Sequence, residues 1–83
     1  MGRQEKLRAR FERIPSDFTW DELNRLLSGY GFELISGTGS RFKFIHAESK
    51  RVVSLHRPHP GNIVKKYALK QVHEILVQEG LIQ

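Results

Sequence analysis

The sequence predicts an α+β domain of two layers, in which helices cover one face of a three-stranded antiparallel sheet. Two segments with helical periodicity, near residues 20–30 and 64–79, flank three short segments with strand character. The middle strand alternates charged and apolar residues over 41–45, which is the pattern of a half-buried strand. With 83 residues, the chain has room for one small domain, which we assign to residues 15–83.

Residues 1–14 are expected to form an N-terminal helix or arm. The segment 4–13 permits a helix, with Leu7, Phe11 and Ile14 at helical spacing. Pro15 ends it, because proline disfavours helical conformation at the residue before it. The pattern does not distinguish a helix packed on the domain from a frayed arm.

The first helix of the domain is predicted to start at Trp20. Thr19 and Glu22 have the spacing of a capping box, in which each side chain bonds the other residue's backbone N–H. Gly29 or Gly31 would end the helix in a left-handed turn. We predict a scaffold role for this helix, whose apolar stripe consists of Trp20, Leu23, Leu26, Leu27 and Tyr30.

Three consecutive strands follow, at 32–36, 41–45 and 51–55, separated by a glycine-rich turn at 37–39 and a polar turn at 48–50. One face of the sheet is predicted to stay open to solvent, with no helix over it, and this open face carries Arg41 and Lys43. A register shift of one residue would exchange the two faces. The face covered by helices is predicted to carry Phe32, Leu34, Phe42, Phe44, Val53 and Leu55.

The last helix is predicted over 64–79, with Gly80 as its stop. Its buried positions are Leu69, Val72, Ile75 and Leu76. Lysines near its start oppose the helix dipole, so either they contact phosphates or they are exposed at a small cost. These lysines are Lys65, Lys66 and Lys70.

The formal net charge of +5 is concentrated in residues 41–70, which hold eight Lys or Arg and a single acid, Glu48. Such an excess is typical of a protein that binds nucleic acid or an acidic partner, although a solvated basic face is the alternative. The absence of cysteine excludes disulfides and thiolate zinc sites. No apolar run reaches the roughly 18 residues of a membrane span, and the charged N-terminus lacks a signal peptide's apolar middle. We therefore expect a soluble cytoplasmic protein with no membrane partner.

The order of the elements and several short motifs together resemble the HicA family of bacterial toxins. The resemblance runs from about residue 18 to residue 81 and implies a fold similar to double-stranded-RNA-binding domains. It also implies cleavage of messenger RNA without a metal or other cofactor, and neutralisation by a HicB-type antitoxin protein. The matching segments are the helix 20–30 with Gly31-Phe32, then Gly39-Ser40, Arg51-Val52-Val53, His59-Pro60-Gly61 with Lys65-Lys66, and Gly80-Leu81.

One departure from the family pattern concerns the catalytic residue. The histidine that usually follows the Gly-Ser pair is replaced here by Arg41. The chain instead carries His56 and His59 in the segment His-Arg-Pro-His-Pro, as a subgroup of the family does. Either the active histidine has moved to the end of the third strand, or the protein binds RNA and cuts it poorly.

Cleavage of RNA by its own 2′-hydroxyl needs a base, an acid and cations that stabilise the charge of the transition state. Histidine suits both proton roles because its unperturbed pKa is about 6.5. We predict that His56 or His59 is the acid–base catalyst, with His56 preferred. The predicted phosphate-binding residues are Arg41, Lys43, Arg57, Lys65 and Lys66.

Each histidine also has a plainer interpretation. His56 and His59 have the setting of solvated turn residues, and His59 could simply position the last helix. His46 is expected to be exposed after the second strand, and His73 to pack at the boundary of the core. With no cysteine present and no acid nearby, His56-x-x-His59 is not expected to bind zinc.

Two other functions fit the same basic domain. A non-catalytic RNA-binding module would need the lysines and arginines but not the histidines. A protein-interaction domain would use its basic face on an acidic partner. Salt-dependent RNA binding separates the last of these from the two RNA functions.

Overall fold

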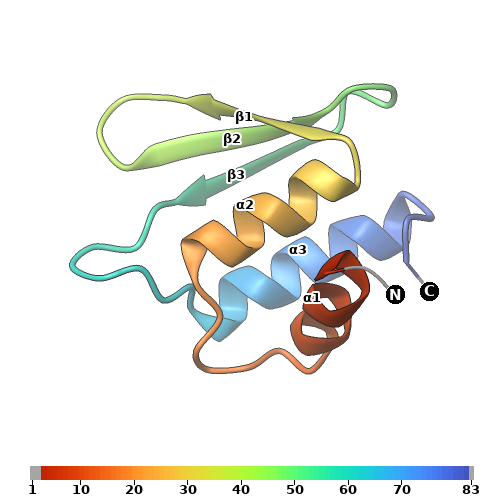
Figure 1. The fold of residues 1–83 in the computed structure, drawn as a ribbon. Coiled ribbons are helices and arrows are strands. Elements are labelled where there is room, and N and C mark those ends of the chain that lie inside the picture. The colour runs from red at the N-terminus through yellow and green to blue at the C-terminus, as the bar shows by residue number, and fades with distance from the viewer. Residues whose placement is uncertain (1–2, 83) are drawn as a thin grey trace.

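The computed structural model describes residues 3–82 and contains three helices and one three-stranded sheet (Figure 1). The predicted α-β-β-β-α order is confirmed, and the N-terminal segment forms an additional helix. In the described part of the chain, none of the helices has the length and apolar character needed to cross a membrane. The elements are α1 (Arg3–Glu12), α2 (Trp20–Gly29), β1 (Phe32–Ser36), β2 (Arg41–His46), β3 (Val52–His56) and α3 (Lys66–Gln78).

The sheet has the order β1-β2-β3, with both neighbouring pairs antiparallel. Phe44 in the central strand lies opposite Leu34 of β1 and Val53 of β3. Phe44 and Val53 are buried, whereas Lys43 and Ser54 next to them are exposed. The predicted assignment of residues to the two faces is therefore confirmed. Strand β2 ends one residue later than expected, and β3 both starts and ends one residue later.

The helices all lie on one side of the sheet (Figure 1). Helices α2 and α3 cover the sheet directly, and α1 packs on them from the side away from the strands. Phe11 of α1 is fully buried, with its ring 5.8 Å from the rings of both Phe18 and His73. The Gln4 side chain donates a hydrogen bond to the carbonyl of Leu26 (3.0 Å). Helix α1 thus contributes to the core rather than forming a separate arm.

The core lies between the sheet and the two covering helices. Trp20 at the start of α2 places its ring 5.4 Å from that of Phe42 and 5.6 Å from that of Phe44. All four predicted apolar positions of α3 are buried. His73 is half-buried beside Phe11, as expected for a residue at the core boundary.

Both covering helices end at glycines with positive φ. Gly31 (φ 90°) follows α2, and a side chain there would meet the His46 ring at 3.3 Å. Gly80 (φ 73°) follows α3, where Gly80 N–H bonds Val77 O and Leu81 N–H bonds Leu76 O, as in a Schellman motif. Gly80 is the residue predicted to end the last helix. Of the two glycines proposed to end α2 in a left-handed turn, Gly29 and Gly31, it is Gly31 that has the positive φ.

The predicted capping box of α2 is confirmed. Glu22 N–H donates to Thr19 Oγ1 (3.1 Å), and Thr19 N–H donates to Glu22 Oε1 (2.9 Å). We expect Thr19→Ala to lower the free energy of unfolding by about 1 kcal/mol, because the Glu22 N–H loses its acceptor. Urea denaturation measures this effect. Ser28→Ala, in an exposed position of the same helix, is the matched control and should change stability by less than about 0.5 kcal/mol.

Tyr30, at the C-terminal end of α2, has a buried hydroxyl with no hydrogen-bond partner among the described residues. Burial raises the pKa of this hydroxyl above its ordinary value of 10.0, an effect that Arg8 opposes and Glu12 reinforces. The Tyr30 hydroxyl therefore ionises at lower pH in the unfolded chain than in the folded chain. It follows that the free energy of unfolding falls as the pH rises above 10, until the folded-state pKa is passed.

We expect Tyr30→Phe to reduce this alkaline loss of stability. At pH 7 the variant should be as stable as the parent or more stable by about 1 kcal/mol, because it lacks the unpartnered hydroxyl. Urea denaturation at neutral and alkaline pH tests both effects. Tyr67→Phe removes an exposed hydroxyl and is the matched control; an equal change in both variants would contradict the assignment to Tyr30.

Candidate functional site

Two loops meet at one end of the sheet, at the left of Figure 1. The β1–β2 turn contains Gly37 and Ser40, and the chain leaving β3 begins with Arg57. Arg57 N–H donates a hydrogen bond to Ser40 O (2.8 Å), while Gly37 N–H donates to Arg41 O (2.8 Å). These backbone bonds hold the loop after His56 beside the Gly-Ser turn.

The start of α3 is fixed to the same end of the molecule. Backbone bonds of 2.7 Å join Trp20 N–H to Asn62 O and Val64 N–H to Phe18 O. The segment before α3 therefore runs along the start of α2 (Figure 1). Lys65, the N-cap residue of α3, is positioned by these bonds.

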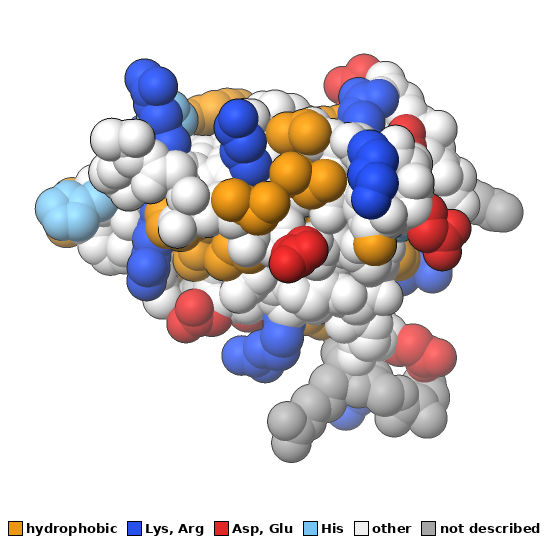
Figure 2. Space-filling view, turned by 90° about the horizontal axis from the view of Figure 1, so that it is seen from above, with side chains coloured by type: hydrophobic (Ala, Val, Ile, Leu, Met, Phe, Trp, Pro, Cys, Tyr) orange, Lys and Arg blue, Asp and Glu red, His pale blue; other side chains and the backbone are white. Residues whose placement is uncertain are grey.

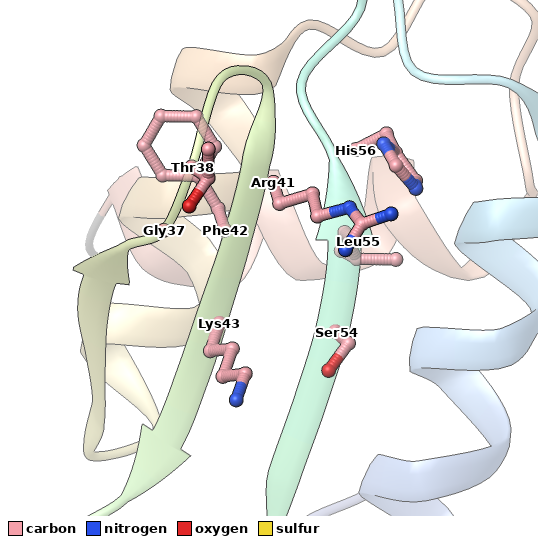
Figure 3. Close-up of a pocket in the computed structure, with 8 residues that line it drawn as sticks. All are labelled: Gly37, Thr38, Arg41, Phe42, Lys43, Ser54, Leu55 and His56. Carbon is pink, nitrogen blue, oxygen red and sulfur yellow. The ribbon is translucent and has the colours of Figure 1, made fainter.

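His56 lies directly opposite Arg41 in the pairing of β2 with β3. The flanking pair is bonded through Arg57 N–H and Ser40 O, so Arg41 and His56 are a non-hydrogen-bonded pair. The Cα atoms in such pairs are about 4.5 Å apart, closer than in bonded pairs. Both side chains are exposed on the face of the sheet that no helix covers, and Arg41 extends toward β3 (Figure 3).

A hollow of about 450 Å³ lies around this pair, and we call it the strand hollow. Arg41 and Lys43 line it from β2, and Ser54 and His56 line it from β3 (Figure 3). Its lining thus combines one histidine with two cations. Three of the residues singled out from the sequence, Arg41, Lys43 and His56, therefore line one hollow.

A second depression of about 200 Å³, the loop groove, lies between the chain after β3 and the start of α3. It is lined by both candidate histidines, His56 and His59, and by two cations, Arg57 and Lys65. His56 belongs to the strand hollow and to the loop groove, so it stands where the two meet. Lys66 is exposed next to Lys65 but lines neither of them.

His59 and Arg57 also border a third, shallower depression beside the Gly-Ser turn. It has a volume of about 400 Å³ and includes Gly39 and Ser40. His59 therefore faces both the turn and the loop groove, whereas it does not line the strand hollow. Both histidines therefore line the loop groove. In addition, His56 lines the strand hollow, and His59 lines the depression beside the Gly-Ser turn.

The cations of this region have no partners of opposite charge within residues 3–82. The salt bridges in that range involve Arg8, Arg10 and Arg51. Arg51 lies at the other end of β3, where it bonds Gln78 (2.9 Å) and approaches Glu79 (3.9 Å). Arg41, Lys43, Arg57, Lys65 and Lys66 are all exposed and in none of these pairs, so an anion could approach them.

His46 is buried, and the expectation that it is exposed is wrong. It is the last residue of β2 and points to the covered face, on the same side as Phe42 and Phe44. Its Nε2 donates to Tyr30 O (2.9 Å), and its Nδ1 accepts from the backbone N–H groups of Glu48 and Ser49 (3.2 Å each). Both ring nitrogens are used structurally, so His46 has no role in the candidate site.

The open face of the sheet also carries apolar side chains. Figure 2 looks onto this face and shows hydrophobic groups near its centre with Lys and Arg around them. Ile35 and Val52 are 44% and 45% exposed, although both stand in strands. In the described part of the chain, no group of three or more His, Cys, Asp or Glu side chains is arranged to hold a metal ion.

The chain is similar to a known protein family. A family model described as "HicA toxin of bacterial toxin-antitoxin" matches residues 20–81, which include the whole sheet, α2, α3 and the candidate site. No curated protein and no solved structure matches the chain.

Proposed function

The chain belongs to the HicA family of bacterial toxin–antitoxin toxins, and from this premise we propose that it cleaves messenger RNA without a metal ion. The observation that supports this proposal best is the pairing of His56 with Arg41 on the open face of the sheet. It combines a proton-transfer group with a phosphate-binding group in one hollow. We further propose a HicB-type antitoxin as the neutralising partner and the cytoplasm, where messenger RNA is found, as the place of action.

In the proposed reaction, His56 takes the proton from a ribose 2′-hydroxyl, and the 2′-oxygen attacks the adjacent phosphorus. The bond between phosphorus and the 5′-oxygen breaks, and His59 gives that oxygen a proton. The products carry a 2′,3′-cyclic phosphate and a 5′-hydroxyl. The shared loop groove supports a joint role for the two histidines in proton transfer, because both line it.

The arginines have the second role in this reaction. Negative charge builds up on the phosphate oxygens as the 2′-oxygen attacks, and fixed cations lower the energy of that state. Arg41 stands beside His56 in the strand hollow, and Arg57 borders the loop groove. A guanidinium can bind two oxygens of one phosphate, which also orients it for attack.

The lysines are proposed to bind the neighbouring phosphates of the RNA. Lys43 lies on the open face two residues from Arg41, and Lys65 lies at the far side of the loop groove. Lys66 stands outside both depressions and would contact a phosphate further along the chain. These residues together outline a path for RNA from the sheet to the start of α3.

The experiment that tests this function measures binding and cleavage of a messenger RNA fragment by the purified protein in EDTA. We expect cleavage, and binding that weakens as salt is raised, because phosphate contacts release counterions. RNA that is bound and left intact would contradict the ribonuclease assignment. RNA that is not bound at all would contradict both RNA functions.

A non-catalytic RNA-binding module is the second candidate, and one specific residue favours it. Arg41 occupies the position after the Gly-Ser pair where the family usually has its catalytic histidine. If that position is essential for chemistry, the basic surface would bind RNA through phosphates and 2′-hydroxyls alone. Binding without cleavage in EDTA is the result that this candidate predicts.

A further inference from the structure

The exposed ring of Tyr67 lies next to the proposed catalytic histidines. Tyr67 is 69% exposed, more than any other exposed large hydrophobic residue of the described chain. It stands in the first turn of α3, away from the helix face that packs on the core. Such an exposed aromatic ring contributes little to the core, so both faces of the ring are free to contact a ligand at the loop groove.

The surroundings of Tyr67 combine apolar surface with positive charge. It lines the loop groove together with His56 and His59. The groove also includes Ile63, which is 43% exposed, and the half-buried Pro58. Among residues 3–82, no acidic side chain lines this groove. A flat apolar group attached to a phosphate would match these walls and the nearby cations.

We propose that Tyr67 stacks on a base of single-stranded RNA next to the cleaved linkage, which rests on the function proposed above. Bases in single strands are free to stack on aromatic side chains, and this contact tolerates any base because each has a flat face. Bases in a duplex are already stacked on one another. The substrate class is therefore single-stranded RNA, with Tyr67 holding a base while Arg57 and Lys65 bind phosphates beside it.

Binding of a 2′-O-methyl RNA oligonucleotide tests this proposal, because such RNA has no 2′-hydroxyl and stays intact. We expect Tyr67→Ala to raise the Kd about 5- to 150-fold, as loss of one stacked base does. Tyr67→Phe keeps the flat ring and should stay within about twofold of the parent. Tyr67 is exposed, so thermal melting should show little change in the stability of either variant.

The salt dependence distinguishes stacking from a charge contact. Tyr67→Ala should leave the slope of log Kd against log salt unchanged, because no phosphate contact is lost. Lys65→Ala is the matched variant in the same groove and should reduce the magnitude of that slope by about 0.7, the value for one phosphate of a single strand. A reduced slope in Tyr67→Ala would contradict stacking.

Other outcomes would overturn the proposal. If Tyr67→Ala binds the oligonucleotide as tightly as the parent, the ring does not contact RNA and is available to a protein partner instead. If Tyr67→Ala weakens binding of duplex RNA to the same extent as single-stranded RNA, the selectivity for single strands is wrong.

These results are separate from those that test the ribonuclease function. If Tyr67→Ala weakens binding as expected but the parent never cuts unmodified RNA, cleavage is refuted and the stacking site is supported. A parent that cuts, with a Tyr67→Ala variant that binds and cuts equally well, would refute the stacking site alone.

Discussion

Replacement of His56 by alanine should lower the rate of RNA cleavage about 10²- to 10⁴-fold, the usual contribution of a positioned acid or base. RNA binding should change little, because the cations around the strand hollow remain in place. Cleavage of a labelled RNA under single-turnover conditions measures the first effect, and binding to 2′-O-methyl RNA measures the second. The imidazole is exposed, so the fold should survive its removal.

Two further variants give this prediction its controls. Val52→Ala changes an exposed residue on the same face of β3, outside the strand hollow, and should leave cleavage within about twofold of the parent. His59→Ala should also slow cleavage. It should alter the alkaline limb of the pH–rate profile, because it removes the proposed acid, whereas His56→Ala should alter the acidic limb, because it removes the proposed base. If His56→Ala cuts as fast as the parent, the assignment of the base to His56 is wrong.

Phe44→Ala should lower the free energy of unfolding by about 3–5 kcal/mol, the usual cost of removing a buried phenylalanine. Phe44 is fully buried in the central strand, and its ring lies 5.6 Å from that of Trp20. Domains of this size are stable by only about 4–12 kcal/mol, so the variant would lose a large share of its stability. Urea denaturation followed by circular dichroism measures the loss.

Two neighbouring valines provide a matched test of the strand register. Val53 is 1% exposed on the covered face, whereas Val52 is 45% exposed on the open face. We expect Val53→Ala to cost about 2 kcal/mol and Val52→Ala less than about 0.5 kcal/mol. Equal costs for the two substitutions would contradict the register of β3 and, with it, the pairing of His56 with Arg41.

Local patterns were sufficient to predict most of the fold. Alternation over 41–45 assigned these five residues of β2 to their faces, and the capping box located the start of α2. The error at His46 came from ending the strand at Ile45. The same alternation, continued by one residue, places His46 on the buried side with Phe42 and Phe44.

The N-terminal segment shows a limit of local patterns. Its sequence permits a helix, but whether that helix packs or frays depends on contacts with distant residues. Phe11 decides the matter by packing against Phe18 and His73, and His73 lies more than sixty positions away in the sequence. No periodicity within residues 4–13 carries that information.

The candidate site could be predicted only in part. The residue types in the His-Arg-Pro-His-Pro segment indicated the chemistry, but the closeness of His56 to Arg41 depends on the register that the 48–50 turn sets. The loop groove depends on tertiary bonds that fix the start of α3, and no local pattern reveals these. The sequence prediction did not include Tyr67, although its position among lysines and off the apolar stripe of α3 distinguishes it from the core residues of that helix.

The chemical nature of the RNA ends tests the proposed mechanism most directly. A single-stranded RNA oligonucleotide is incubated with the protein in EDTA, and the fragments are identified by mass spectrometry. We expect an upstream fragment ending in a 2′,3′-cyclic phosphate and a downstream fragment with a 5′-hydroxyl, both lost in His56→Ala. Intact RNA, or a downstream fragment with a 5′-phosphate, would contradict attack by the 2′-hydroxyl.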